Sequence, residues 1–152
     1  MSRFTEVLTV SPLGDGRTWI TRREFGYDIG AEGSGNTVEV PVGFMTDFAS
    51  VPRIFWAVLP QWGKYGNAAV IHDYCYWDQA RPRQECDHIF FEGMGVLGVS
   101  TVTKHVMYWA VRYFGGMAWK GNQKRKAHKL NKFAENRTIK SVEKPADLRA
   151  KM

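Results

Sequence analysis

Residues 67–78 read NAAVIHDYCYWD, and residues 82–94 read PRQECDHIFFEGM. In the first stretch Asn67 is a suitable N-cap, and the residues after it favour a helix that runs to about Trp77. In the second stretch Pro82 is placed to open another helix, which runs to about Met94. Because only a short connection joins the two, we expect neighbouring and roughly antiparallel helices. The predicted fold is organised around this helical hairpin.

The segments before the hairpin have the pattern of short β-strands. We expect strands at residues 4–10, 17–25 and 37–44, with turn-forming clusters between them at residues 11–16 and 30–36. Pro41 lacks a backbone donor, so the third strand should lie at a sheet edge or end near this residue. Together these strands predict a small antiparallel sheet.

Two further helices are expected on either side of the hairpin. Ser50 can cap one that ends before Pro60, and Ser100 can start one that ends at Gly115-Gly116. In the second of these, apolar side chains share one face, namely those of Val102, Val106, Trp109, Ala110 and Tyr113. The predicted fold class is therefore α+β, with a small N-terminal antiparallel sheet followed by a helical half and a basic C-terminal arm.

The charge of the chain is unevenly distributed. The 152 residues hold 21 Lys and Arg against 15 Asp and Glu, a net charge of +6. Residues 120–152 account for 11 of the basic and 3 of the acidic residues, which leaves 10 and 12 for residues 1–119. We therefore predict a single, faintly acidic α+β domain over residues 1–119 and a basic C-terminal arm over residues 120–152.

Several classes of protein are disfavoured by the sequence. No uncharged apolar run approaches the roughly 18 residues of a spanning helix, and the first residues lack the pattern of a signal peptide. Cys75 and Cys86 are too few for a disulfide scaffold and lack the spacing of a zinc site. We therefore expect the chain to be made and kept in the cytoplasm unless a partner or cell lysis carries it out, and any metal would be held by oxygen and nitrogen.

The hairpin carries a candidate catalytic site. On a helix His72 shares a face with Tyr76, while Asp73 lies about 100° round from His72. If the next helix packs antiparallel, Asp87 can face His72, and such a pair acts as a general base on water. Asp73 would then be free to hold a hard cation through oxygen ligands. The alternative reading is a hydrogen-bonded core histidine, which is the commoner role of a helical His among aromatic residues.

The pattern His72-Asp73-x-Cys75-Tyr76, followed by Cys86-Asp87, resembles the signature of the secreted phospholipases A2. In that family the histidine is the base, the adjacent aspartate binds calcium, and the later aspartate orients the histidine. The resemblance implies catalytic roles for His72, Tyr76 and Asp87. It also implies calcium or another divalent cation at Asp73, and a brace between Cys75 and Cys86. The glycine-rich calcium loop of that family has no counterpart here.

A second resemblance covers more of the chain. Residues 42–53 read VGFMTDFASVPR, and together with the hairpin and with Arg83, Asp87 and Met94 they look like the family known as DUF1353, over roughly residues 37–95. Members of that family are mostly encoded by bacteriophages and prophages. The resemblance therefore implies a phage origin, and with it a place in the virion or the host cytoplasm, much more firmly than it implies an activity.

Within this motif Asp47 is a candidate second metal ligand. As structural residues, Asp47 and Ser50 would form the turn and the cap that join the sheet to the following helix. As functional residues, Asp47 could converge on His72 and Asp73, whereas Ser50 lacks the surroundings of an activated nucleophile. Both readings stay open.

The densest charge run is at residues 124–133. It is either a solvated surface segment or an attachment site for nucleic acid, an anionic membrane or an acidic partner protein. Phe133 is the only aromatic residue beyond Trp119, so base stacking is not favoured.

Two classes of function follow from these patterns. The first is a phage hydrolase acting on a lipid ester or another envelope component. The second is a non-enzymatic head or tail accessory protein that docks on other virion proteins through its basic arm. An accessible His72 beside Asp73 and Asp87 would favour the hydrolase, and a fully buried His72 would favour the second class.

Overall fold

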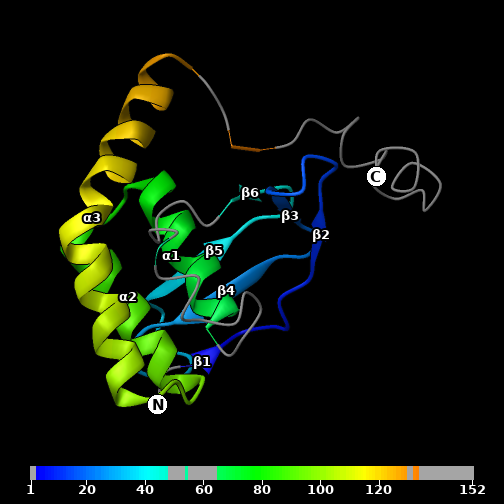
Figure 1. The fold of residues 1–152 in the computed structure, drawn as a ribbon. Helices are drawn as coiled ribbons and strands as arrows, with labels where there is room; N and C mark the ends of the chain where they lie inside the picture. The colour runs from blue at the N-terminus through cyan, green and yellow to red at the C-terminus, as the bar shows by residue number, and fades with distance from the viewer. Residues whose placement is uncertain (1–2, 48–53, 55–64, 130–131, 134–152) are drawn as a thin grey trace.

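The computed structural model describes residues 3–47, 54, 65–129 and 132–133, which form short strands followed by three helices (Figure 1). The strands are β1 (Arg3–Phe4), β2 (Val10–Pro12), β3 (Trp19–Thr21), β4 (Phe25–Asp28), β5 (Thr37–Val40) and β6 (Met45–Thr46). The helices are α1 (Gly66–Asp78), α2 (Arg83–Val96) and α3 (Thr101–Ala127). This arrangement confirms the α+β class.

The strands form two antiparallel sheets, in the orders β1-β4-β5 and β2-β3-β6, where a single sheet was expected. The predicted strand at residues 17–25 is split because Arg23 and Glu24 are exposed and have no apolar face to pack. The predicted strand at residues 4–10 is likewise interrupted around the exposed Val7. The expectation for Pro41 is confirmed, since β5 is an edge strand and ends at Val40.

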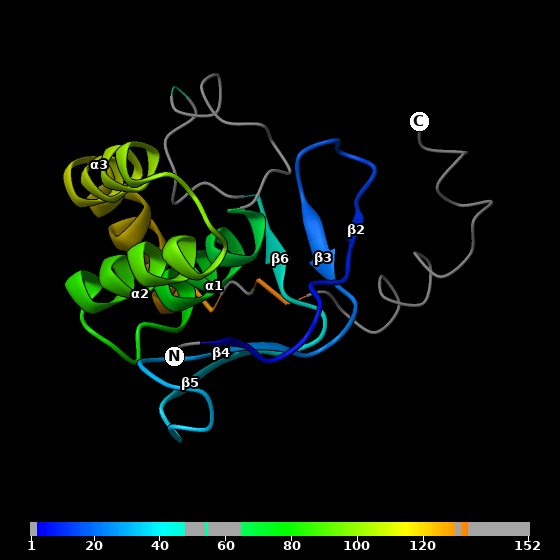
Figure 2. The same ribbon diagram turned by 90° about the horizontal axis from the view of Figure 1, so that it is seen from below.

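The helical hairpin agrees with the sequence to within two residues at each end. Helices α1 and α2 pack against each other and lie between the strands on one side and α3 on the other (Figures 1 and 2). Ten of the residues of α1 are buried, because this helix is covered on both sides. The core of the molecule is therefore built around the helix that carries His72.

Helix α3 differs from the prediction in its length and in the face it buries. Ser100 caps it as expected, accepting a hydrogen bond from the Thr103 backbone N–H at 3.2 Å. The helix does not stop at Gly115-Gly116 but continues to Ala127. A Cβ at Gly115 would lie 2.5 Å from the Tyr76 hydroxyl oxygen, so this glycine permits close packing rather than a helix end. Of the five apolar residues expected to share a packed face, only Ala110 is buried.

The predicted boundary between Trp119 and Lys120 lies inside α3. Beyond it, the buried Asn122 side chain donates a hydrogen bond of 3.0 Å to the Tyr76 carbonyl oxygen. Farther along, the Met45 N–H donates to the Lys132 carbonyl at 2.7 Å, and Phe133 forms a bridge with Phe44. The first part of the basic segment is thus in contact with the body.

Some predictions lie outside the described residues. They concern the helix from Ser50 to Pro60, apart from Ile54, and the arm beyond Phe133. Among the helices that the structure describes, none is both long and apolar enough to cross a bilayer.

Candidate functional site

Three side chains from two other segments converge on the carboxylate of Asp87. His72 Nε2 lies 2.8 Å from Asp87 Oδ1, and the Tyr76 hydroxyl donates to the same oxygen at 2.7 Å. Arg112, on α3, donates to Asp87 Oδ2 at 2.7 Å. Asp87 is fully buried, so this cluster of His72, Tyr76, Asp87 and Arg112 ties all three helices together at one buried charge. We call these four residues the Asp87 cluster.

The cluster keeps Asp87 ionised. Burial raises the pKa of this carboxyl, but hydrogen bonds from His72, Tyr76 and Arg112 outweigh burial and hold the pKa below its usual value. Conversely, burial and the negative charge of Asp87 raise the pKa of Tyr76 far above its usual value, so the phenol stays protonated and donates. The hydrogen bond to Asp87 raises the pKa of Arg112. The result is a fixed acceptor surrounded by donors.

The ionised Asp87 determines the tautomer of His72. A carboxylate only accepts hydrogen bonds, so the imidazole proton must lie on Nε2. In the neutral ring Nδ1 is then the basic nitrogen, which is the arrangement of a general base held by a carboxylate. The ring is packed between Tyr76 and Phe90, with centroids 4.2 and 4.7 Å from its own. Its orientation is thus fixed, but His72 is 0% exposed.

Asp73 faces a different set of partners. Thr46, in β6, donates to Asp73 Oδ2 at 2.6 Å, and Lys132 Nζ lies 3.8 Å from the same oxygen. Asp73 is buried, whereas the neighbouring Asp47 is exposed. Within the described ranges no group of three His, Cys, Asp or Glu side chains is placed to hold a metal ion. Ser50 lies outside the described residues.

The two cysteines lie at the positions the sequence singled out, on adjacent helices. Both Cys75 and Cys86 are buried free thiols, so the brace implied by the phospholipase resemblance is absent as a disulfide. A hydrogen bond with Cys86, together with burial, raises the pKa of the Cys75 thiol well above its usual value. A thiol in this state is a weak nucleophile, which favours a packing role.

Arg112 and Lys132 belong to the site but were not among the sequence candidates. Both come from the segment after residue 100 and reach back to carboxylates on the hairpin. The sequence around Arg112 gives no indication that this residue pairs with a buried carboxylate. Lys132 lies in the charge run of residues 124–133, whose composition predicts a solvated surface segment or an attachment site.

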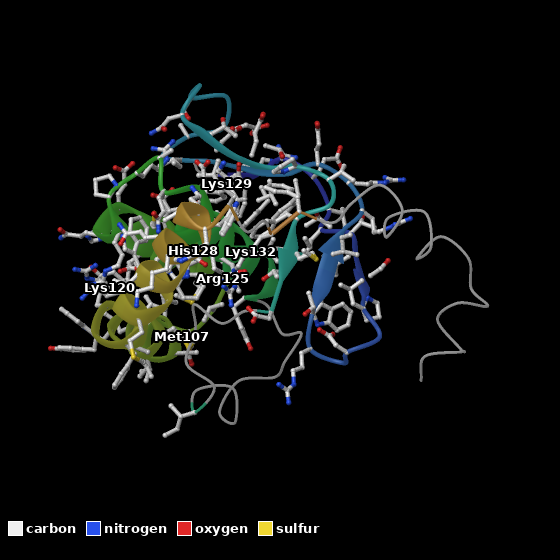
Figure 3. All side chains as sticks on the ribbon, turned by 90° about the horizontal axis from the view of Figure 1, so that it is seen from above. Met107, Lys120, Arg125, His128, Lys129 and Lys132 are labelled. Carbon is white, nitrogen blue, oxygen red and sulfur yellow. The ribbon has the colours of Figure 1, made fainter. Side chains whose placement is uncertain are left out.

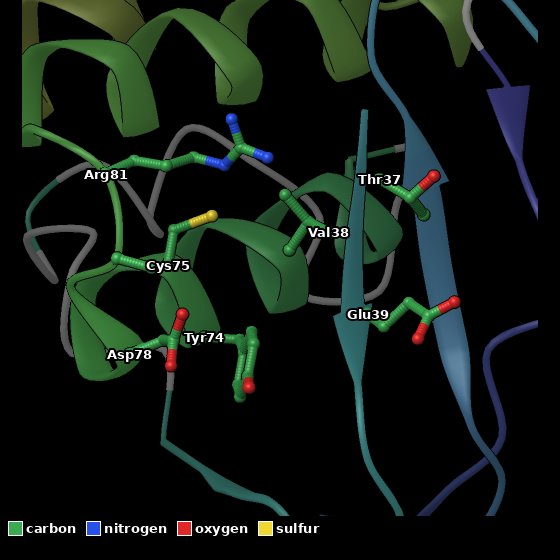
Figure 4. Close-up of a pocket in the computed structure, with 8 residues that line it drawn as sticks. Thr37, Val38, Glu39, Tyr74, Cys75, Asp78 and Arg81 are labelled. Carbon is green, nitrogen blue, oxygen red and sulfur yellow. The ribbon is translucent and has the colours of Figure 1, made fainter. Parts of the chain in front are cut away.

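A cavity of about 160 Å³ lies beside α1 but not at His72. It opens between β5 and the C-terminal end of α1, and Figure 4 shows Val38 pointing from β5 toward Cys75, whereas Thr37 and Glu39 point to the other side of the strand. Tyr74, Cys75 and Asp78 line the cavity from α1, the helix that also carries His72 and Tyr76. The cavity is mixed in charge, and its lining does not include the cluster itself.

Comparisons with known proteins place the chain in a family. A relative in Sinorhizobium fredii, the uncharacterized protein y4jT, is 35% identical over 94 residues, which cover 60% of this chain and 27% of the relative. The matched part thus spans about a quarter of that longer protein. No solved structure matches the chain. The family profile described as "Protein of unknown function (DUF1353)" matches residues 19–111, a range that includes His72, Asp73, Tyr76 and Asp87. The chain therefore belongs to the DUF1353 family.

Proposed function

We propose that this protein is a hydrolase of lipid esters in which His72 activates water. The observation that carries the proposal is the 2.8 Å contact between His72 Nε2 and Asp87 Oδ1, supported by the Tyr76 hydrogen bond to the same oxygen. Water would give a proton to Nδ1 as its oxygen attacks the ester carbonyl, and Asp87 would stabilise the imidazolium that forms. The proton then passes to the leaving alcohol, so the products are a carboxylic acid and an alcohol.

The choice of a lipid ester rests on the phospholipase resemblance and on two matches to it in space. The histidine and the later aspartate are hydrogen-bonded across adjacent helices, and the tyrosine four residues after the histidine binds the same carboxylate. This supports the same division of roles, with His72 as the base and Asp87 as the orienting group.

The surroundings of Asp73 disfavour a divalent cation while Lys132 stays in place. Thr46 already donates to Asp73 Oδ2, and the Lys132 ammonium supplies a positive charge 3.8 Å from the same oxygen. A divalent cation would have to displace Lys132 because two cations repel each other at this distance. Asp73, with Asp47 as a second ligand, would hold calcium only if Lys132 moved away. The proposed hydrolysis therefore uses no cation.

The complete burial of His72 favours a second candidate, a non-enzymatic structural component. Among the described residues, no buried side-chain nitrogen or oxygen lacks a hydrogen-bond partner, as is typical of a protein core that only supports the fold. In this alternative the Asp87 cluster only joins the three helices, and the basic residues after Trp119 dock on another protein. For a phage-encoded chain the role would be that of a head or tail accessory protein.

Fatty-acid release from phospholipid vesicles and the cleavage of a soluble ester test the hydrolase, each with calcium and with a chelator. We expect the wild-type chain to hydrolyse at least one substrate, and His72→Ala to lower the rate by about 10²–10⁴, the usual contribution of a general base. The rate should be low, because Nδ1 is buried and, like the other buried side-chain nitrogens and oxygens of the described residues, already has a hydrogen-bond partner that water has to displace.

His88→Ala is the matched control, because His88 is an exposed histidine on the adjacent helix. It should leave the rate unchanged. If His72→Ala does not fold by circular dichroism, Tyr76→Phe tests the site with little change in volume and should still lower the rate. Background rates in the folded wild type on both substrates would favour the structural candidate.

A further inference from the structure

Helix α3 carries an apolar stripe on its outer face. The side chains are exposed by 47–80% and belong to Val102, Val106, Trp109, Tyr113 and Met117. Their spacing of three and four residues places them within one narrow sector of the helix. Over about 22 Å of helix length, they form a continuous row. Such a row on a helix whose opposite side is already packed marks an interaction surface.

The charge of α3 is all of one sign. The helix holds six Lys and Arg residues and no Asp or Glu. Arg112 is engaged by Asp87, but Lys120, Lys124 and Arg125 are exposed. Lys120 and Lys124 follow Tyr113 and Met117 at seven-residue steps, so they continue the stripe on the same face. Figure 3 shows Lys120 and Arg125 with His128, Lys129 and Lys132 gathered at this end of the molecule.

We propose that this face of α3, the stripe together with Lys120 and Lys124, binds the surface of an anionic lipid bilayer. The helix would lie in the plane of the membrane, with its aromatic and aliphatic side chains at the headgroup boundary. Trp and Tyr favour this depth because their rings are apolar and carry a polar atom. The lysines reach lipid phosphates by extending their flexible stems along the surface.

Charge complementarity favours a bilayer over the other occupants of such a face. A second copy packed in parallel would bring Lys120 and Lys124 against their own counterparts, which is repulsive. An antiparallel copy would cover the apolar stripe but would offer these lysines no acidic partner on α3, because the helix holds no Asp or Glu. Nucleic acid would pair with the lysines but would leave Val102, Val106 and Met117 against water or phosphate. An anionic bilayer satisfies both halves of the face. The surface belongs to α3 alone and does not rest on the proposed hydrolysis.

The test is co-sedimentation of the full chain with vesicles of phosphatidylglycerol and phosphatidylcholine, and with vesicles of phosphatidylcholine alone. We expect binding to the first and at least tenfold weaker binding to the second. The double variant Trp109→Ser/Tyr113→Ser should bind anionic vesicles at least tenfold more weakly than the wild type. Lys120→Gln/Lys124→Gln should weaken binding and flatten its dependence on salt.

Val7→Ser is the matched control, because Val7 is also an exposed apolar residue, at 77%, but lies outside α3. It should bind as the wild type does, and circular dichroism confirms that each variant is folded. His72→Ala should also bind normally, which separates this proposal from the hydrolase. Failure of the wild type to sediment with anionic vesicles overturns the proposal. The proposal is also overturned if the chain forms a dimer, or a complex with DNA, in preference to binding vesicles. The same double variant, Trp109→Ser/Tyr113→Ser, would then abolish that dimer or complex.

Discussion

Replacing Asp87 by Asn should lower the free energy of unfolding by about 3 kcal/mol, the lower end of the range for breaking a buried ion pair. The carboxylate accepts from His72, Tyr76 and Arg112 at once, and Asn offers one oxygen and an NH₂ group where two acceptors are needed. The Arg112 side chain is 24% exposed, so water compensates part of its lost partner, which keeps the loss at the lower end. Urea denaturation of both proteins measures the difference.

Glu85→Gln is the matched control for Asp87→Asn. Glu85 lies on the same helix and pairs with Arg81 at 2.7 Å, but its side chain is 45% exposed. Removing this charge should change the stability by less than about 1 kcal/mol, as for other surface pairs. An equal decrease in the free energy of unfolding in the two variants would contradict a larger contribution of Asp87 to stability than that of a surface charge.

The same comparison has a defined pH dependence. Because the pKa of Asp87 is lower in the folded protein than in the unfolded chain, its ionisation stabilises the fold at pH values above about 4. This contribution is lost as the pH falls through the folded-state pKa. The stability difference between wild type and Asp87→Asn should therefore be constant near neutral pH and shrink in acid.

Replacing Gly115 by Ala should lower the free energy of unfolding by about 2 kcal/mol. The new Cβ would lie 2.5 Å from the Tyr76 hydroxyl oxygen and 3.2 Å from two ring carbons, so the ring has to move. Overpacking of this kind costs about 1–3 kcal/mol, and displacement of Tyr76 also weakens its hydrogen bond to a charged acceptor. The higher helix propensity of Ala offsets only about 1 kcal/mol of this loss in the free energy of unfolding.

The adjacent glycine provides the control. A Cβ at Gly116 has no atom within 4 Å, and this residue lies in the same helix. Gly116→Ala should therefore raise the stability by up to about 1 kcal/mol through helix propensity alone. If the contact with Tyr76 determines the effect at Gly115, thermal denaturation should show a lower melting temperature than the wild type for Gly115→Ala and a higher one for Gly116→Ala. Stabilisation by both substitutions would show that this contact is easily relaxed.

The helical hairpin was predictable because its signals are local. Pro82 and a short connection indicate two adjacent helices, and helical spacing then places Asp87 against His72. The predicted N-cap role of Asn67 was wrong, because α1 already begins at Gly66 and no side chain caps it. Tyr76 could be assigned to the same face for the same reason. The position of these side chains follows from a period of 3.6 residues and one turn, without any long-range contact.

The rest of the site depends on contacts between distant segments. Arg112 and Lys132 reach carboxylates 25 and 59 residues away, and no periodic pattern encodes such a pairing. Gly115 resembles a helix end in the sequence, whereas in the structure its lack of a side chain admits Tyr76. The apolar face of α3 has a core-like spacing, but the helices of the hairpin pack on the opposite side. The sequence shows that this face is apolar, and only the structure shows that it is exposed.

The tautomer of His72 is the most direct test of this account. Long-range ¹H–¹⁵N NMR spectra of protein labelled at histidine report which ring nitrogen carries the proton. We predict the proton on Nε2 in the neutral ring, with slow exchange with water because His72 and Asp87 are both 0% exposed. Asp87→Asn should speed this exchange. A neutral ring with its proton on Nδ1 would contradict the account, since Asp87 would then not hold His72 as a base.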